Sequence, residues 1–326
     1  GYGIAAAPAN AIDANGRPDY ALADIPVAAR PGASSLDVDL PGLYVGEGLK
    51  GYAIVGATRD EVDFQDNDDR TEVTRYDGAD GVNINSLPRK LAFALRFAEP
   101  NLVVSGELGS DSRILYKRDV VDRAKTIAPF LKFDRDPYPA VIDGKVTWIL
   151  DAYTSTDMFP YAQRVNPRAV RSGDLRSSVN YVRNSVKVVI DAYDGTPEFY
   201  IVDDRDPIAK SYRQQFPDLF TDAAPPKELT EHFRYPEDLF RMQTDMWGRY
   251  RITEASEFYD AAGAWSVAQD PGNSIGQTAV ESVIDASGNI ISSSEVRIAP
   301  QYLLMRLPGD DDESFVIFRP FVPFSD

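Results

Sequence analysis

The spacing of apolar and polar residues predicts a chain in which short helices alternate with extended hairpins. Apolar residues recur at intervals of three and four in four stretches, as they do along one face of an amphipathic helix. In the first stretch, Leu87, Leu91, Ala94 and Leu95 share a face. Each stretch opens with a residue that favours the start of a helix. These residues are Ser86, Asp119, Asp206 and Pro236.

Between the second and third helical stretches, the pattern changes to an alternation with a period of two, which is typical of strands. Residues 138–153 and 184–204 each predict a strand, a tight turn and a second strand, with turns at Asp143-Gly144 and Asp194-Gly195. Hairpins therefore connect most of the predicted strands. This arrangement predicts an α+β fold with antiparallel, hairpin-rich sheets and several interspersed short helices, rather than a parallel doubly wound sheet.

Length and charge narrow the class of protein. The chain has 326 residues, which is longer than the commonest single domain, and we expect one region spanning 1–326 with two lobes that meet near residue 225. Its 34 basic and 51 acidic residues give a net charge of −17. That balance argues against binding to a nucleic-acid backbone or to an anionic membrane surface, because both select clustered Lys and Arg.

The composition also limits metal and cofactor chemistry. The chain has no cysteine, which excludes disulfides and thiolate metal sites, and its one histidine, His232, excludes a zinc site built on several histidines. None of the glycine-rich motifs that cradle phosphates is present. We therefore expect no metal and no cofactor.

A near-repeat supplies the candidate catalytic residues. The segments "ILDAYTST" and "VIDAYDGT" each run an apolar strand into Asp-Ala-Tyr, which places Asp151 with Tyr153 and Asp191 with Tyr193. Two carboxylates at one end of a sheet, about 5–10 Å apart and lined by tyrosines, would suit a glycoside hydrolase. The alternative is structural, because an aspartate at a strand end accepts hydrogen bonds from the N–H groups of the next turn while the tyrosine packs. The pattern favours the structural interpretation and leaves the catalytic one open.

The second candidate is a basic stretch in an otherwise acidic chain. It lies between the two hairpins and is rich in arginine, so it is a plausible contact element for a partner, although a solvated loop explains it equally well. Its arginines are Arg164, Arg168, Arg171 and Arg176, with Arg183 close by.

Several long blocks of the chain resemble one family. They include "IAPFLKFDRDPYPAVIDGKVTWILDAYTST", "NYVRNSVKVVIDAYDGTPEFYI", "DPIAKSYRQQFPDLF" and "RYPEDLFRMQ". These blocks resemble the uncharacterised multi-pass membrane proteins of family 0182. The resemblance runs from Tyr2 to about Trp265 and thins beyond it. The high content of alanine and aspartate resembles that of actinobacterial members.

The resemblance implies topology rather than chemistry. No apolar run in this chain approaches the roughly 20 residues of a membrane span. Members of the family carry several N-terminal transmembrane helices followed by a large soluble region facing outside the cytoplasmic membrane, and this chain corresponds to part of that region. The resemblance brings no catalytic residue, substrate or cofactor with it. We therefore expect an extracytoplasmic domain of a polytopic membrane protein.

Three functions are consistent with that expectation. The favoured one is binding or assembly at the cell envelope, with the protein's own transmembrane region, an envelope protein, a lipid or a glycan as partner, and not with nucleic acid. The first alternative is a carboxylate-dependent hydrolase of envelope glycans that uses Asp151 and Asp191. The second is a ligand-sensing or substrate-handing domain of a transporter-like protein, which predicts a closed apolar pocket.

Overall fold

The computed structural model divides the chain into two compact units, which are described separately. Unit 1 comprises Gly1–Ser155 and Arg183–Phe233, and unit 2 comprises Thr156–Val182 and Arg234–Asp326. The chain therefore leaves unit 1 after Ser155, returns to it at Arg183 and leaves it again after Phe233. The structure describes residues 1–65, 71–165, 174–175, 179–260, 263–272, 280–284 and 290–323.

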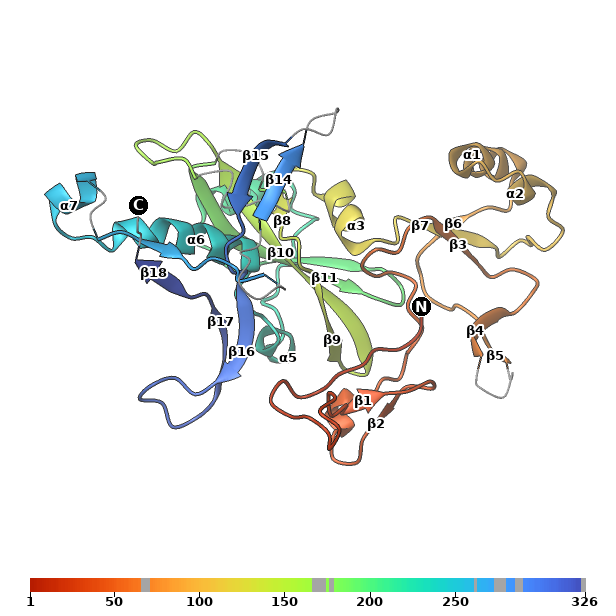
Figure 1. Cartoon of the computed structure of the whole chain (residues 1–326). Coiled ribbons are helices and arrows are strands. Elements are labelled where there is room, and N and C mark those ends of the chain that lie inside the picture. The colour runs from red at the N-terminus through yellow and green to blue at the C-terminus, as the bar shows by residue number, and fades with distance from the viewer. Residues whose placement is uncertain are drawn as a thin grey trace. The chain divides into compact units, whose positions relative to one another are not determined.

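The main sheet of unit 1 has five strands in the order β12-β11-β10-β8, with β9 also paired to β10 (Figure 1). Its two long central strands carry the Asp-Ala-Tyr repeats, and every pairing for which a register is described is antiparallel. The strands are β8 (Lys132–Phe133), β9 (Tyr138–Ile142), β10 (Lys145–Thr156), β11 (Tyr181–Asp191) and β12 (Pro197–Ile201).

The core of unit 1 lies on both faces of this sheet, because successive residues of a strand point to opposite sides. On one face, Leu150 of β10 and Val188 of β11 cluster with Ala124 of the helix α3 (Val120–Ile127). On the other face, Ile149 clusters with Leu229 of the short helix α5 (Lys227–Glu231). The middle of each central strand is therefore buried on both faces, and its few polar side chains are enclosed with the apolar ones.

The two predicted hairpins form, but their turns differ. Asp143 and Gly144 both have positive φ values, of 49° and 71°, and join β9 to β10 as a two-residue turn that requires this left-handed backbone. The turn after β11 is longer, and only Gly195 has a positive φ, of 72°. A Cβ atom at Gly195 would lie 2.8 Å from the Arg123 guanidinium, so both backbone and space require glycine there.

A smaller sheet of unit 1, in the order β3-β7-β6, packs against the helix α1. Phe93, Ala94 and Phe97 of α1 cluster with Ile114 of β7. Of the four residues that the sequence places on one helical face, only Ala94 is buried. The elements are β3 (Tyr52–Val55), β6 (Val82–Asn83), β7 (Arg113–Tyr116), α1 (Leu87–Phe97) and α2 (Asn101–Val104).

The remaining elements of unit 1 are peripheral ribbons and short helices. They are β1 (Leu22–Ala23), β2 (Ala28–Ala29), the 3-10 helix η1 (Ser34–Leu36), β4 (Glu61–Gln65), β5 (Thr71–Thr74) and α4 (Pro207–Gln215). The ribbons pair β1 with β2 and β4 with β5.

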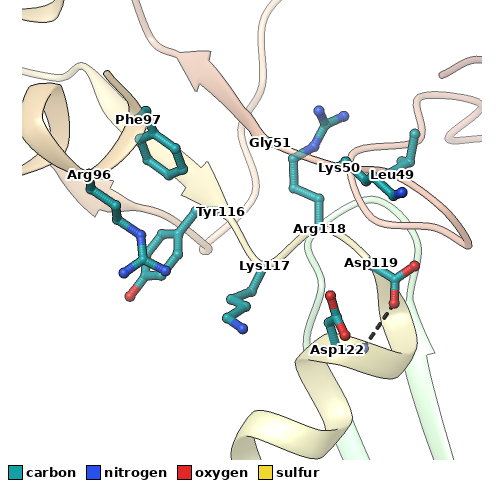
Figure 2. A pocket seen from close by; sticks show the side chains of 10 residues that line it. All are labelled: Leu49, Lys50, Gly51, Arg96, Phe97, Tyr116, Lys117, Arg118, Asp119 and Asp122. Atoms are coloured by element: carbon teal, nitrogen blue, oxygen red, sulfur yellow. Dashed lines mark hydrogen bonds between the residues drawn. The ribbon is translucent and has the colours of Figure 1, made fainter. Parts of the chain in front are cut away.

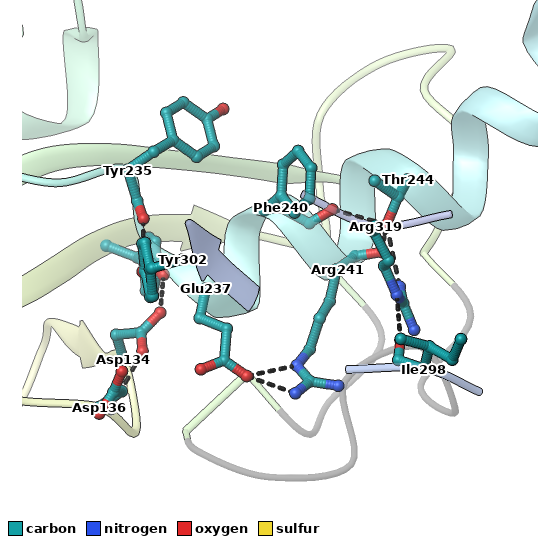
Figure 3. Close-up of polar contacts among 11 residues, drawn as sticks. Asp134, Asp136, Tyr235, Glu237, Phe240, Arg241, Thr244, Ile298, Tyr302 and Arg319 are labelled. Carbon is teal, nitrogen blue, oxygen red and sulfur yellow. Dashed lines mark hydrogen bonds and ion pairs between the residues drawn. The ribbon is translucent and has the colours of Figure 1, made fainter. Parts of the chain in front are cut away.

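The described residues of unit 2 form two helices and three two-stranded antiparallel ribbons, β13-β18, β14-β15 and β16-β17. Figure 3 shows Arg319, whose Nε donates to the Ile298 carbonyl at 2.6 Å and whose Nη1 donates to the Thr244 hydroxyl at 2.9 Å. Burial and then the positive charge of Arg241 lower the pKa of Arg319 to about 10. The elements are α6 (Glu237–Tyr250), α7 (Ala255–Asp260), β13 (Trp265–Val267), β14 (Val280–Ile284), β15 (Ile290–Glu295), β16 (Gln301–Met305), β17 (Ser314–Phe318) and β18 (Phe321–Pro323).

The predicted fold class is confirmed, since antiparallel ribbons and short helices alternate along the chain. The four predicted helix starts are confirmed as well, and the carboxylates of Asp119 and Asp206 each accept a hydrogen bond from the first turn of their helix. Among the described residues, no helix has the length and apolar character needed to cross a membrane.

Candidate functional site

The first Asp-Ala-Tyr copy lies inside the main sheet, not at its end. Asp151 is only 2% exposed, and its carboxylate forms an ion pair with Lys187 of the neighbouring strand β11. The Lys187 ammonium also lies 5.2 Å from the centre of the Phe233 ring. Burial raises the pKa of Asp151 above its usual range, and the adjacent Lys187 opposes that rise. The structural prediction of a strand terminator is therefore wrong for Asp151, because β10 continues to Thr156.

Tyr153 belongs to the same buried network. Its side chain is fully buried, and its hydroxyl donates to the carboxylate of Asp134. The other carboxylate oxygen of Asp134 accepts the backbone N–H of Asp136 at 3.1 Å. The backbone N–H of Asp134 in turn donates to the Asp151 carbonyl at 2.9 Å. With both Asp151 and Tyr153 enclosed, neither side chain is available to a substrate unless the sheet opens.

The second copy does end a strand. The Asp191 carboxylate accepts the backbone N–H groups of Tyr193 at 2.7 Å and Asp194 at 3.2 Å, as an aspartate does in an Asx turn. It also lies 3.5 Å from the Lys145 ammonium. The Tyr193 hydroxyl donates to the Asp77 carboxylate at 2.7 Å. The structural interpretation therefore holds for Asp191 and Tyr193.

The two aspartates are not brought together as a catalytic pair. Asp151 contacts Lys187, and Asp191 lies four residues further along the same strand β11. At a rise of roughly 3.3 Å per residue, those four residues correspond to about 13 Å. Glycosidases need a carboxylate separation of about 5–10 Å across an open cleft. The repeat thus gives two similar hairpins with different polar roles.

The described arginines of the basic stretch also have local partners. Arg164 in unit 2 lies 3.8 Å from the Asp157 carboxylate, and Arg183 in unit 1 lies 3.2 Å from that of Asp203. Three further predicted contact residues, Arg168, Arg171 and Arg176, lie outside the described residues.

Tyr193 contributes to a cluster of three tyrosines. Its ring centre lies 5.4 Å from that of Tyr44 and 5.2 Å from that of Tyr76, and the latter two are 4.6 Å apart. The Tyr44 hydroxyl donates to the Glu61 carboxylate at 2.6 Å. Burial and then the charge of Asp80 raise the pKa of Tyr76 to about 12.

This pKa predicts a loss of stability at high pH. A phenol with a raised pKa in the fold stabilises it fully below the unfolded value of about 10, and that contribution is lost as the pH rises toward 12. The melting temperature of unit 1 should therefore fall as the pH rises from 10 to 12, while phenolate absorbance at 295 nm rises. Tyr76→Phe should reduce this fall in melting temperature, whereas Tyr20→Phe, at an exposed tyrosine, should not. The same dependence of melting temperature on pH in both variants would contradict the raised pKa of Tyr76.

A surface pocket of unit 1 gathers the positive charges that the sequence analysis did not single out (Figure 2). It has a volume of about 210 Å³ and lies between the end of α1, the end of β7 and the start of α3. Its four cations are Lys50, Arg96, Lys117 and Arg118. Within the described part of the chain, none of the four forms an ion pair with a carboxylate.

Three of the four cations are positioned by different local features. The Arg96 guanidinium stacks 5.4 Å from the centre of the Tyr116 ring, which also lines the pocket. Lys117 has a φ of 56°, and this left-handed residue turns the chain out of β7. Arg118 donates from Nε to the Tyr44 carbonyl at 2.7 Å, and burial lowers its pKa.

The acidic residues of the pocket are partly committed elsewhere. The Asp119 carboxylate caps α3 by accepting the N–H of Asp122 at 2.9 Å, and its other oxygen accepts the N–H of Gly48 at 2.8 Å. Phe97 and Tyr116 supply an apolar wall. An anionic group next to an apolar or sugar-like body fits this lining, because guanidinium and ammonium groups bind phosphate and carboxylate oxygens.

Sequence reasoning missed this pocket because its residues come from three separate segments. Lys50, Arg96 and Lys117 are far apart in the chain, and each is an ordinary surface residue by itself. A weak signal was present in the consecutive "YKRD", which follows a strand and precedes a helix. The sole histidine, His232, lies at the end of α5, and among the described residues no group of three or more His, Cys, Asp or Glu side chains is arranged to hold a metal ion.

The fold and the pocket define an α+β protein with an open, cation-lined surface cavity. Comparison with known proteins extends this description. The chain belongs to the uncharacterised protein family UPF0182, whose family match covers residues 1–326. The match therefore includes the part after Trp265, where the resemblance was expected to thin. No solved structure matches the chain.

Relatives come from diverse organisms. A UPF0182 protein of Methanospirillum hungatei is 38% identical over 325 residues, which is 99% of this chain and 33% of that protein. A UPF0182 protein of Clostridium acetobutylicum is 39% identical over 322 residues, covering 98% of this chain and 32% of that protein. One from Micrococcus luteus is 36% identical over 342 residues, covering 99% and 30%. The chain thus spans about a third of the length of the curated relatives it matches.

Proposed function

We propose that the chain is the extracytoplasmic region of an envelope membrane protein, of actinobacterial origin, and that its role is to bind an anionic envelope component. The pocket of unit 1 would hold the anionic group. Relatives about three times as long leave room for membrane-spanning segments elsewhere in the protein. The finding that supports the binding role is the set of four cations around one cavity, none of which forms an ion pair with a described carboxylate, in a chain with a net charge of −17.

The pocket favours a charged ligand over the alternatives. A ligand-sensing domain for apolar molecules would need a closed apolar cavity, whereas this one is lined by charged side chains. A glycan hydrolase would need two accessible carboxylates, whereas Asp151 is enclosed in the sheet. The volume of about 210 Å³ suits a headgroup-sized anion, such as a phosphate ester, better than a drug-sized molecule.

Phosphate compounds test this proposal directly. Glycerol 3-phosphate and inorganic pyrophosphate should bind in isothermal titration and raise the melting temperature of unit 1, while glycerol should do neither. Lys117→Met removes an exposed pocket cation without disturbing the core, so it should weaken binding about tenfold, and adding Arg118→Met should weaken it further.

The matched control is Lys210→Met, which removes an exposed cation from α4. Its affinity for the phosphates should equal that of the unaltered chain. Absence of saturable binding at millimolar concentrations, or equal affinities for the Lys117 and Lys210 variants, would overturn the pocket assignment.

A further inference from the structure

A second surface pocket of unit 1 combines an apolar floor with an acidic rim. It lies between β3, α2 and the segments that follow each of them, and it shares no lining residue with the cationic pocket. Its volume of about 320 Å³ is that of a site for a small molecule, since such sites begin at about 300 Å³.

The floor of this pocket belongs to the packed core of the small sheet. Tyr52 and Ile54 are alternate residues of β3, so they lie on the same face of the sheet. Leu102 of α2, which is only 2% exposed, and Leu108 pack with them. The Tyr52 ring also contacts that of Phe97, with ring centres 4.6 Å apart. The floor is therefore preformed, and an apolar group can be buried on it without rearranging the core.

Hydrogen bonds join the two segments that form the rim. The Glu107 carbonyl accepts the backbone N–H of Thr58 at 3.0 Å and the Thr58 hydroxyl at 3.1 Å. The backbone N–H of Glu107 donates to the Ser105 hydroxyl at 3.2 Å. The segments that follow β3 and α2 are therefore fixed to each other, which gives the pocket a defined opening.

Negative charge dominates the rim, because four of the five charged residues that line the pocket are acidic. They are Asp60, Glu61, Glu99 and Glu107, and Arg59 is the fifth. Within the part of the chain that the structure describes, neither Glu107 nor Arg59 forms an ion pair. An excess of carboxylates around a concave site attracts ligands of the opposite charge.

The protein engages the other three carboxylates to different degrees. Glu61 is not available to a ligand, because its two oxygens accept three hydrogen bonds from the protein. Asp60 lies 3.3 Å from an exposed arginine. Glu99 uses one oxygen to accept a backbone N–H of α2 at 3.2 Å. Burial and then the charge of Glu99 raise the pKa of Tyr52, so this carboxylate acts on the floor of the pocket.

We propose that this pocket binds a small organic cation, an amine attached to an aromatic or branched aliphatic body. The body would lie on Tyr52, Ile54 and Leu108, and the ammonium would face the carboxylates of Glu99 and Glu107. Charge-assisted hydrogen bonds and the Tyr52 ring would both stabilise the ammonium. This site goes beyond the proposed anion pocket and does not depend on it.

The floor distinguishes this class of ligand from inorganic cations. Calcium and magnesium need a shell of oxygen ligands, and among the described residues no group of three or more acidic or histidine side chains is arranged to hold a metal ion. A bare apolar floor contributes nothing to a metal ion, whereas it stabilises the body of an organic amine by removing it from water.

Three compounds with a similar aromatic body and different charges test the proposal. They are 2-phenylethylamine, 2-phenylethanol and 3-phenylpropionate. In ligand-observed NMR titrations the amine should bind saturably at millimolar concentrations, at least about fivefold more tightly than the alcohol and more tightly still than the acid. Added salt should reduce the preference for the amine, because ions screen the carboxylates.

Paired substitutions test the acidic rim. Glu99→Gln with Glu107→Gln keeps the hydrogen-bond acceptors and removes two charges, so it should weaken binding of the amine about fivefold and leave the alcohol unchanged. The matched control is Glu228→Gln with Glu231→Gln, which removes the same charge from exposed positions of α5. These two residues line a different acidic pocket of unit 1, and their substitution should leave the affinity for the amine unchanged.

A further substitution tests the floor. Ala57 lines the pocket, and leucine at this position would fill part of the cavity. Ala57→Leu should therefore weaken binding of the amine and the alcohol alike, at least about threefold, while the melting temperature without ligand shows that the variant is folded.

Three results would overturn the proposal: no saturable binding of the amine, equal affinities for the amine and the acid, or an equal loss of amine affinity in the two glutamine pairs. The last would show that any acidic surface of the chain attracts the amine. Glycerol 3-phosphate carries the opposite charge and is tested on different residues, so its binding or failure to bind is independent of these results.

Discussion

Replacing Lys187 with methionine is expected to destabilise unit 1 by about 3–5 kcal/mol, because it leaves the Asp151 carboxylate buried without its ion-pair partner. The side chains of Lys187 and Asp151 are 5% and 2% exposed, so water cannot take over the role of the lost ammonium. Urea unfolding should show this loss as a lower midpoint with an unchanged slope. Substituting phenylalanine for Trp247 and Trp265 would leave Trp148 of β10 as the fluorescence reporter of unit 1.

The matched control removes both charges. Asp151→Leu together with Lys187→Met exchanges the ion pair for apolar contacts, and such exchanges are often neutral or stabilising. The double variant should therefore recover most of the stability that Lys187→Met loses, and a double-mutant cycle would measure the coupling between the two residues. A loss below 1 kcal/mol in Lys187→Met would contradict the assignment of an uncompensated buried charge.

The same variant should show a distinctive pH dependence. Burial already raises the pKa of Asp151, and removing Lys187 removes the charge that opposes this rise. Because the folded pKa is then above the unfolded value of about 3.9, protonation favours the folded state. The destabilisation should be smallest near pH 4 and should grow as the pH rises through the folded pKa.

Replacing Asp206 with alanine is expected to cost roughly 3 kcal/mol, the sum of a lost helix cap and lost charge-assisted hydrogen bonds. The fully buried Asp206 accepts the N–H of Ile208 at 3.0 Å at the start of α4. Its other oxygen accepts the Ser185 hydroxyl at 2.6 Å and that of Thr154. The substitution thus removes a cap and leaves two buried hydroxyls of the central strands without their acceptor.

Asp206→Asn is the matched control. Asparagine is a good capping residue. Its amide N–H groups can also donate hydrogen bonds to the oxygens of the two hydroxyls that donate to the aspartate. The free energy of unfolding of Asp206→Asn should therefore lie between that of Asp206→Ala and that of the unaltered chain. Equal losses in the two variants would show that the charge, and not the cap, carries the contribution of Asp206.

Local signals predicted the parts of the fold whose causes are local. Ser86, Asp119, Asp206 and Pro236 predicted four helix starts, because capping depends on a few neighbouring residues. The Asp143-Gly144 turn was predicted for the same reason, since its left-handed backbone is a property of the dipeptide and its flanking strands.

Features set by distant packing escaped prediction. The two Asp-Ala-Tyr copies have similar sequences but different surroundings. β10 continues to Thr156, beyond its copy, so Asp151 pairs with Lys187 inside the sheet. β11 ends at Asp191, which therefore accepts hydrogen bonds from the turn that follows. The apolar pattern of α1 likewise identified a helix without showing which apolar face packs. The pocket cations needed three segments to come together, which no single stretch of sequence records.

The discontinuous path of the chain has a consequence for synthesis. Residues 156–182 belong to unit 2 but are made before Arg183–Phe233, which completes unit 1. On the ribosome, unit 1 can therefore finish folding before the rest of unit 2, the residues from Arg234 onward, has been synthesised. At about 5–20 residues per second, those residues take roughly 5 to 20 seconds to synthesise. During that interval unit 1 is complete, whereas only the first of the two segments that make up unit 2 has been synthesised.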